Sequence, residues 1–172
     1  MNIMHKPQTH ARGFTLVEVL VSLVVLSMGL LGIAKLVLLS SHSNDSAYLR
    51  SQATDLAYAM LDDMRGNRGQ AMAGAYNIPL NTAPAAPGVC LNVNCAPPAL
   101  ANYDVNTWLA RLAAALPSGT GSVQTVTSVA PAPAGTTAVI TVQWDDSAAQ
   151  SVFGGVAQGN AAPMTVTLET ML

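Results

Sequence analysis

Charged side chains are scarce in this sequence. Only 9% of its 172 residues are charged, against ~25% in an average soluble protein. The 7 basic and 9 acidic residues give a formal net charge of −2. The chain therefore lacks the surplus of Lys and Arg that neutralises nucleic-acid phosphates. This composition argues against a nucleic-acid partner and against a highly charged, disordered chain.

Histidine is scarcer still, with three residues in the whole chain: His5, His10 and His42. If residues 1–13 are removed, only His42 remains. A hydrolase of the Ser/His/Asp type or a histidine-rich metal site is then nearly excluded. The sequence accordingly predicts no catalytic residue, no metal site and no cofactor.

The best remaining candidates for an enzymatic or ligand-binding site are two pairs of adjacent acids, Asp62 with Asp63 and Asp145 with Asp146. Neighbouring side chains point apart on a helix or a strand. We therefore interpret the first pair as part of a solvated helix face and the second as a solvated turn.

A long apolar run stands near the N-terminus. Residues 14–34, FTLVEVLVSLVVLSMGLLGIA, contain a single charge, Glu18. As a helix these 21 residues would extend ~31 Å, enough to cross the hydrocarbon core of a bilayer. The polar, basic segment MNIMHKPQTHARG precedes the run. The sequence thus predicts a membrane segment.

Three interpretations of this segment compete. A secretory signal peptide has an apolar region of only ~7–15 residues, whereas this run is longer and contains Glu18. An ordinary anchor gives Glu18 no purpose, because a charge inside a membrane is costly and usually functional. In the third interpretation the segment passes from the membrane into an assembly, where Glu18 finds a partner.

The string GFTLVEVLVSLVVLSMGLLG, residues 13–32, resembles the processing signal of type IV pilins and type II secretion pseudopilins. The resemblance implies that a prepilin peptidase cuts after Gly13 on the cytoplasmic side. It also implies that Phe14 becomes the N-methylated amino terminus and that Glu18 docks the subunit. The Phe14 ammonium of a neighbouring subunit would offset the cost of burying the Glu18 carboxylate.

A long helix is expected beyond the membrane run, because no proline occurs between Pro7 and Pro79. Apolar residues recur there at helical spacing. They are Leu49, Ala53, Leu56, Met60 and Met64. Gly66 is the expected end of the helix. Residues 14–65 would then form one helix of ~78 Å, with its first half in lipid or among other subunits.

Residues 70–100 are rich in Ala, Pro, Gly and Asn and predict a loop. This loop contains both cysteines of the chain, Cys90 and Cys95, and too few further ligands for a metal site. We expect a local disulfide, which favours an oxidising compartment such as the periplasm. Asp104 is expected to cap a second helix, which Pro117 ends.

Three strands are expected in the last third of the chain, at residues 122–129, 137–144 and 164–171, with a further short strand around 152–156. Their apolar and polar residues alternate, as in half-buried antiparallel strands. The prediction is one α+β fold, in which a long N-terminal helix, membrane-spanning in its first half, packs on a small antiparallel sheet in a pilin-like manner. Residues 1–13 form the leader, 14–39 the membrane and assembly half of the helix, and 40–172 the periplasmic globular domain.

Within the pilin superfamily, several elements resemble PilV-type minor pilins, the type IV pilus modification proteins. They are the D-x-M-R-x-N element at residues 62–67, the cysteine pair, the W-x-x-x-L…LP-x-G pattern at 108–119 and the V-x-W strand end at 142–144. The resemblance implies a minor pilin that helps to initiate and cap a type IV pilus, supports twitching motility and adhesion, and performs no chemistry.

The implied partners are a prepilin peptidase, the inner-membrane platform, sibling minor pilins, the major pilin, a tip adhesin and, before assembly, membrane lipid. The implied location is the inner membrane, crossed once with the C-terminal domain in the periplasm, and later the pilus tip. Two alternatives stay open. One is a minor pseudopilin of type II secretion, and the other is a membrane-anchored periplasmic enzyme or binding domain.

Overall fold

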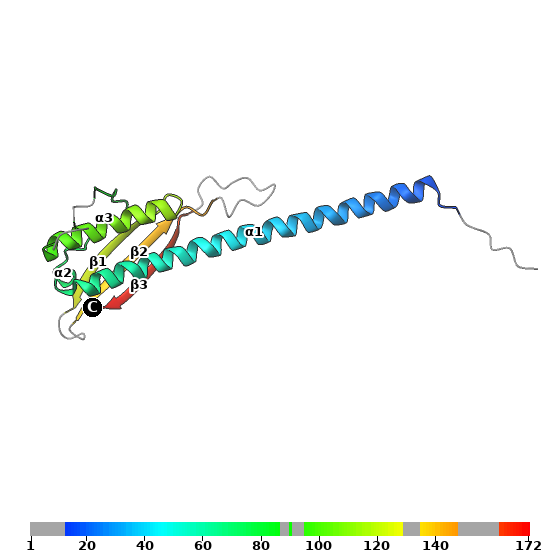
Figure 1. Cartoon of the computed structure of the whole chain (residues 1–172). Coiled ribbons are helices and arrows are strands. Elements are labelled where there is room, and N and C mark those ends of the chain that lie inside the picture. Colours follow the sequence, from blue (N-terminus) through cyan, green and yellow to red (C-terminus); the bar gives the residue numbers. More distant parts are fainter. Residues whose placement is uncertain (1–12, 87–89, 91–94, 129–134, 148–161) are drawn as a thin grey trace, which may run out of the picture. The chain divides into compact units, whose positions relative to one another are not determined.

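The structure is a computed structural model that describes residues 13–86, 90, 95–128, 135–147 and 162–172 (Figure 1). The chain divides into two compact units, residues 1–40 and residues 41–172. One helix, α1 (Leu16–Gly66), contributes its first half to one unit and its second half to the other. The expected position of the helix end at Gly66 is confirmed.

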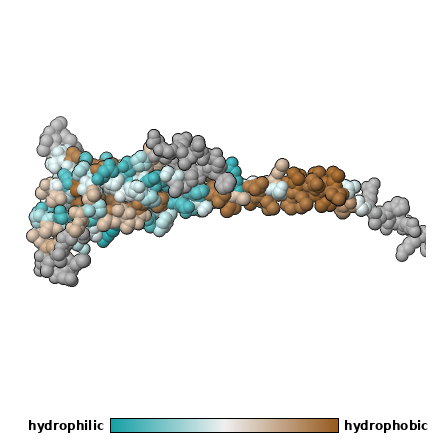
Figure 2. All heavy atoms as spheres, turned by 90° about the horizontal axis from the view of Figure 1, so that it is seen from above, coloured by the Kyte–Doolittle hydropathy of each residue, from teal (hydrophilic) through white to brown (hydrophobic). Residues whose placement is uncertain are grey.

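In the first unit, the described chain is almost entirely the apolar half of α1. Its large apolar side chains are exposed, Phe14 and Leu16 each to 82%. Figure 2 shows that the surface of this part of the helix is mostly hydrophobic. A surface of this kind is not stable in water and requires lipid or partner helices.

In the second unit, a three-stranded antiparallel sheet has the order β1–β2–β3 (Figure 1). The strands are β1 (Thr120–Ser128), β2 (Gly135–Trp144) and β3 (Met164–Met171). The second half of α1 and the helix α3 (Pro97–Ala115) share one core with this sheet. The expected α+β, pilin-like arrangement of a long apolar N-terminal helix packed on a small antiparallel sheet is confirmed.

The core follows the predicted periodicities. Met60 and Met64 of α1 are fully buried, as the helical spacing indicated. On β2, every second residue from Ala138 to Trp144 is buried, as the alternation indicated. Trp108 of α3 joins the two helices, because its Nε1 donates a hydrogen bond to the Leu56 carbonyl oxygen at 2.9 Å.

The start of α3 differs from the prediction. The helix begins at Pro97, where a loop was expected, and Asp104 lies inside it rather than at its cap. Pro97 and Pro98 occupy the first turn, where a backbone N–H has no helical partner and the fixed φ of proline suits a helix. The two prolines therefore start this helix instead of preventing it.

Two further elements lie in or beside the predicted loop. A short helix, α2 (Arg68–Met72), follows α1 after a single residue. Ile78 forms an isolated antiparallel bridge with Val123 of β1. The short strand expected around residues 152–156 lies outside the described residues.

Candidate functional site

The residues of the predicted processing site lie at the start of α1. Gly13 and Phe14 precede the helix, and both are exposed. The space around the Gly13 Cα is open, since an added Cβ would meet no atom within 4 Å. Nothing in the described chain therefore covers the Gly13–Phe14 peptide bond.

Glu18 lies in the first turn of α1, where the N-terminal end of the helix dipole favours an acidic side chain. Its backbone N–H donates to the carbonyl oxygen of Thr15 at 3.1 Å and lies 3.3 Å from the Thr15 hydroxyl. Thr15 thus caps the helix start. The Ser22 hydroxyl donates to the Glu18 carbonyl oxygen at 2.7 Å.

Phe14 and Glu18 line the same shallow groove on this end of the helix. The remaining lining residues are Val19, Ser22, Leu23 and Leu26. The groove is thus apolar, with the Glu18 carboxylate as its one charge. It suits contact with another apolar helix end that carries a positive charge.

Helix α1 also meets the length and hydropathy requirements of a membrane span. Its apolar stretch is long enough to cross a membrane, and none of this stretch is buried within the chain. An unburied apolar stretch of this kind fits membrane anchoring through the N-terminal helix.

Comparison with known proteins supports this interpretation. Residues 8–34 match the family model described as the prokaryotic N-terminal methylation motif. The match includes Gly13, Phe14 and Glu18. The motif indicates a protein of the type IV pilin or pseudopilin type. It implies processing by a prepilin peptidase and assembly with other pilins, and it suggests a structural subunit rather than an enzyme.

The match covers the N-terminal part of the chain only. No curated protein and no solved structure shows significant similarity to this chain. The motif therefore indicates the class of protein, and it does not identify a particular member of that class.

The two cysteines form a disulfide, Cys90 to Cys95, with a Cα–Cα distance of 5.6 Å. The pair lies in the chain just before α3, where Cys95 is two residues from Pro97. A bond of this kind is typical of proteins in oxidising compartments.

A cluster of polar groups between α1 and α3 was not predicted. The Tyr76 hydroxyl donates to the Asp104 Oδ2 at 2.7 Å, and the Tyr76 side chain is fully buried. Burial, followed by the charge of Asp104, raises the pKa of Asp63, while Arg111 opposes the shift. Burial also raises the pKa of Asp104. The hydrogen bond from Tyr76 and the charge of Arg111 oppose this shift but do not cancel it.

No sequence pattern could have revealed this cluster, because its members are far apart in the chain and meet only in the fold. Within the described residues, no group of three or more His, Cys, Asp or Glu side chains is placed to hold a metal ion.

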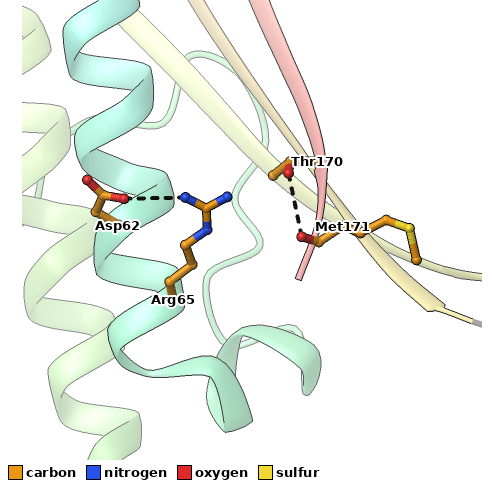
Figure 3. A network of polar contacts seen from close by, with 4 residues as sticks. All are labelled: Asp62, Arg65, Thr170 and Met171. Carbon is orange, nitrogen blue, oxygen red and sulfur yellow. Dashed lines mark hydrogen bonds and ion pairs between the residues drawn. The ribbon is translucent and has the colours of Figure 1, made fainter.

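Within each pair of adjacent acids, the two side chains have different surroundings, as expected for neighbouring residues on a helix or in a turn. Asp62 is exposed and pairs with Arg65 at 3.6 Å on the surface of α1 (Figure 3). Asp145 is exposed, and the N–H of Ser147, which donates to it at 2.9 Å, lowers its pKa.

The interpretation of Asp146 as part of a solvated turn was wrong. Asp146 is only 3% exposed, and its Oδ2 accepts a hydrogen bond from the Ser46 hydroxyl at 2.7 Å. This hydrogen bond joins the segment after β2 to α1. It also offsets part of the hydration that the carboxylate loses on burial.

Proposed function

We propose that this protein is a minor pilin, a low-copy subunit that helps to initiate a type IV pilus and lies at its tip. The observation that carries the proposal is the methylation motif, with Phe14 and Glu18 on one groove at an exposed apolar helix end. The pilin-like α+β domain that follows supports it.

In this proposal a prepilin peptidase cuts after Gly13, and the new terminus at Phe14 is N-methylated. The Glu18 carboxylate then accepts the Phe14 ammonium of a neighbouring subunit. Within a bundle of apolar helices the two charges attract strongly, because little water screens them. The pair sets one axial register between subunits.

The chain is accordingly divided into a leader (1–13), a membrane and assembly segment (14–39) and a periplasmic domain (40–172). The unit boundary between residues 40 and 41 supports the second division. The disulfide supports a periplasmic location for the domain. Before assembly the protein is a single-pass protein of the inner membrane.

The order of motifs after the membrane segment supports a PilV-type member. The partners would then be the inner-membrane platform, sibling minor pilins, the major pilin and a tip adhesin, and the pilus would serve twitching motility and adhesion. The methylation motif also occurs in pseudopilins of type II secretion, which makes a minor pseudopilin the second candidate.

N-terminal mass spectrometry of the protein from its host tests the proposal. We expect a mature chain that begins with N-methylated Phe14. We expect Gly13→Leu to remain unprocessed, because a bulky side chain next to the cleaved bond would hinder its binding by the peptidase; the space around Gly13 within this chain is open, so the substitution should not disturb the chain itself. Recovery of the wild-type chain with residue 2, or a residue near Lys35, at its terminus would reject the processing step. Presence in sheared pili rather than in a secretion complex separates the two candidate functions.

A further inference from the structure

The two edges of the sheet differ in how their backbone groups are used. At the β1 edge, the Ile78 N–H donates to the Val123 carbonyl oxygen at 2.9 Å, and the Val123 N–H donates back at 3.1 Å. The Asn77 Oδ1 accepts the next outward N–H, that of Thr125, at 2.9 Å. The middle of the β1 edge is therefore closed by its own chain.

The β3 edge is different. The N–H of Leu172 donates to the Thr136 carbonyl oxygen at 2.9 Å, so this pair is a hydrogen-bonded pair of the β2–β3 ladder. Hydrogen-bonded and non-hydrogen-bonded pairs alternate in antiparallel ladders. The even-numbered residues of β3 therefore bond to β2, and the odd-numbered ones direct their N–H and C=O groups outward. The outward residues are Thr165, Thr167, Glu169 and Met171.

Within the described part of the chain, no main-chain hydrogen bond joins these outward groups to another segment. The one contact here is local: the Met171 carbonyl oxygen accepts the Thr170 hydroxyl at 3.5 Å (Figure 3). Such a row of unpaired groups is a template for another strand. β3 also lacks the lysines and prolines that usually protect an edge, and Glu169 is its one charged residue.

The side chains of β3 also show that the core is incomplete at this edge. Met164, Val166 and Leu168 pack against the core cluster but remain only partly buried. The facing residues of β2 are fully buried. An added strand with apolar residues on the same face would cover the partly exposed side chains of β3.

We propose that the β3 edge binds an extended strand of a second, non-identical subunit of the same membrane-anchored assembly. This inference rests on the proposed function, because it takes the partner from the same membrane. The strand that fits has apolar residues over Val166 and Leu168 and a basic residue opposite Glu169.

A second copy of this chain does not fit the edge. If two copies joined through this same edge, their β3 strands would lie antiparallel to each other. A two-fold axis perpendicular to the sheet would then relate the two copies. That axis reverses the second half of α1 in one copy, since the helix packs along the face of the sheet. This reversal conflicts with two copies that enter one membrane through their N-terminal ends. Pairing of β3 with the β1 edge of another copy fails as well, because Ile78 and Asn77 occupy that edge.

Photo-crosslinking of the full-length protein in its host membranes tests this inference. A benzophenone amino acid at Thr167 reports on the β3 edge, and the same residue at Thr127, whose backbone also points outward, reports on the β1 edge. We expect an adduct from position 167 whose peptide comes from an extended segment of another protein with an N-terminal methylation motif. We expect no such adduct from position 127.

A backbone variant gives a second measurement. Thr167→Pro removes one outward N–H that the sheet does not use, so folding should survive. We expect co-purification of the partner subunit to fall about fivefold or more, a loss of ~1 kcal/mol or more. Thr127→Pro, the matched control on β1, should leave co-purification unchanged. Retention of the Cys90–Cys95 disulfide and of protease resistance verifies the fold of both variants.

An adduct only to a second copy, an adduct only to another segment of the same chain, or unchanged co-purification of Thr167→Pro would overturn the inference. Failure of the proposed function has a different signature, since the wild-type protein itself would then be absent from sheared filaments and keep its leader.

Discussion

Asp63 and Asp104 are close enough that the charge of Asp104 raises the pKa of Asp63, and burial raises both above the usual value of 3.8. A carboxyl group with a raised pKa holds its proton more tightly in the folded state. Between the unfolded and the folded pKa the native protein therefore binds more protons, and stability falls as the pH rises through this window. At pH 7 the two charged groups reduce the stability of the contact between α1 and α3.

Removal of one of these charges should stabilise the protein at neutral pH. We expect Asp63→Asn to raise the free energy of unfolding at pH 7 by about 1 kcal/mol or less, because both carboxyls remain partly in contact with solvent, which screens them. The gain should shrink as the pH falls, because the raised pKa of the wild-type carboxyl lets it take up its proton before an ordinary aspartate does. Thermal unfolding of the full-length protein in detergent measures the gain at each pH. The exposed Asp62→Asn serves as the control with little effect, and a loss of stability in Asp63→Asn at pH 7 would contradict the prediction.

The hydrogen bond from Ser46 to Asp146 gives a second prediction for single residues. Ser46→Ala leaves a buried carboxylate oxygen without that donor, which should cost ~1–3 kcal/mol. Ser43→Ala, at an exposed position of the same helix, should cost almost nothing. Denaturant unfolding of the two variants side by side measures the difference. Equal midpoints would show that the bond contributes little.

At the scale of elements, the helices and strands with a strong local period were predictable. Alternation identified β2 and β3, and the helical spacing of apolar residues together with Gly66 identified the second half of α1. The start of α3 was not predictable in this way, because Pro97 can begin a helix as well as prevent one. Whether Pro97 begins a helix or prevents one depends on the contacts that the helix makes with the rest of the core.

The candidate site shows the same contrast. Gly13, Phe14 and Glu18 belong to one local motif, so the sequence alone is enough to predict them as site residues. The contacts of Tyr76 with Asp104 and of Ser46 with Asp146 join residues 28 and 100 positions apart. Such pairs follow from the packing of whole elements on one another, and no spacing along the chain encodes them.

The packing of α3 on β1 depends on a glycine. A Cβ at Gly121 would overlap the ring of Trp108 and approach Leu112 Cδ1 to 2.8 Å. We expect Gly121→Ala to cost ~1–3 kcal/mol, because Trp108 would have to move within a close-packed core. Gly69→Ala in α2, where an added Cβ meets nothing within 4 Å, should be neutral or stabilising. Thermal unfolding, with near-ultraviolet circular dichroism as a monitor of the tryptophans, compares the two. A Gly121→Ala protein as stable as wild type would show that the core can rearrange there.

At the scale of the whole molecule, the two units are suited to different surroundings, one to water and the other to an apolar environment. Residues 41–172 bury their own core of aromatic and aliphatic side chains, whereas the described residues before Ser41 bury none. The first unit is therefore stable only in lipid or among other apolar helices. A protein built in this way can exchange one apolar environment for the other. We expect Glu18 to favour the assembly over the lipid, because a positive charge of a neighbouring subunit can meet its carboxylate there.

A passive anchor gains nothing from an acid in its span, so removal of the charge should leave insertion unchanged or improve it. In an assembly subunit, Glu18→Ala removes the partner of a neighbour's terminal ammonium. We expect incorporation into sheared filaments to fall by about tenfold or more. The lost charge pair would lie among apolar helices, where little water screens it. A loss of ~1.4 kcal/mol already corresponds to a tenfold change. Cleavage after Gly13 and membrane residence should persist, because neither step requires the carboxylate.

The matched control is Ser27→Ala. Among the described residues, the Ser27 hydroxyl donates a hydrogen bond only to the Val24 carbonyl oxygen of its own helix, at 2.8 Å. This variant should assemble like the wild type. The measurement is the amount of each variant that co-purifies with filaments in a strain without the wild-type copy, together with the mass of its N-terminal peptide. Normal incorporation of Glu18→Ala would exclude docking as the role of the carboxylate. Loss of cleavage in the same variant would instead assign Glu18 to recognition by the peptidase, because a chain that keeps its leader has no Phe14 ammonium to offer a neighbour.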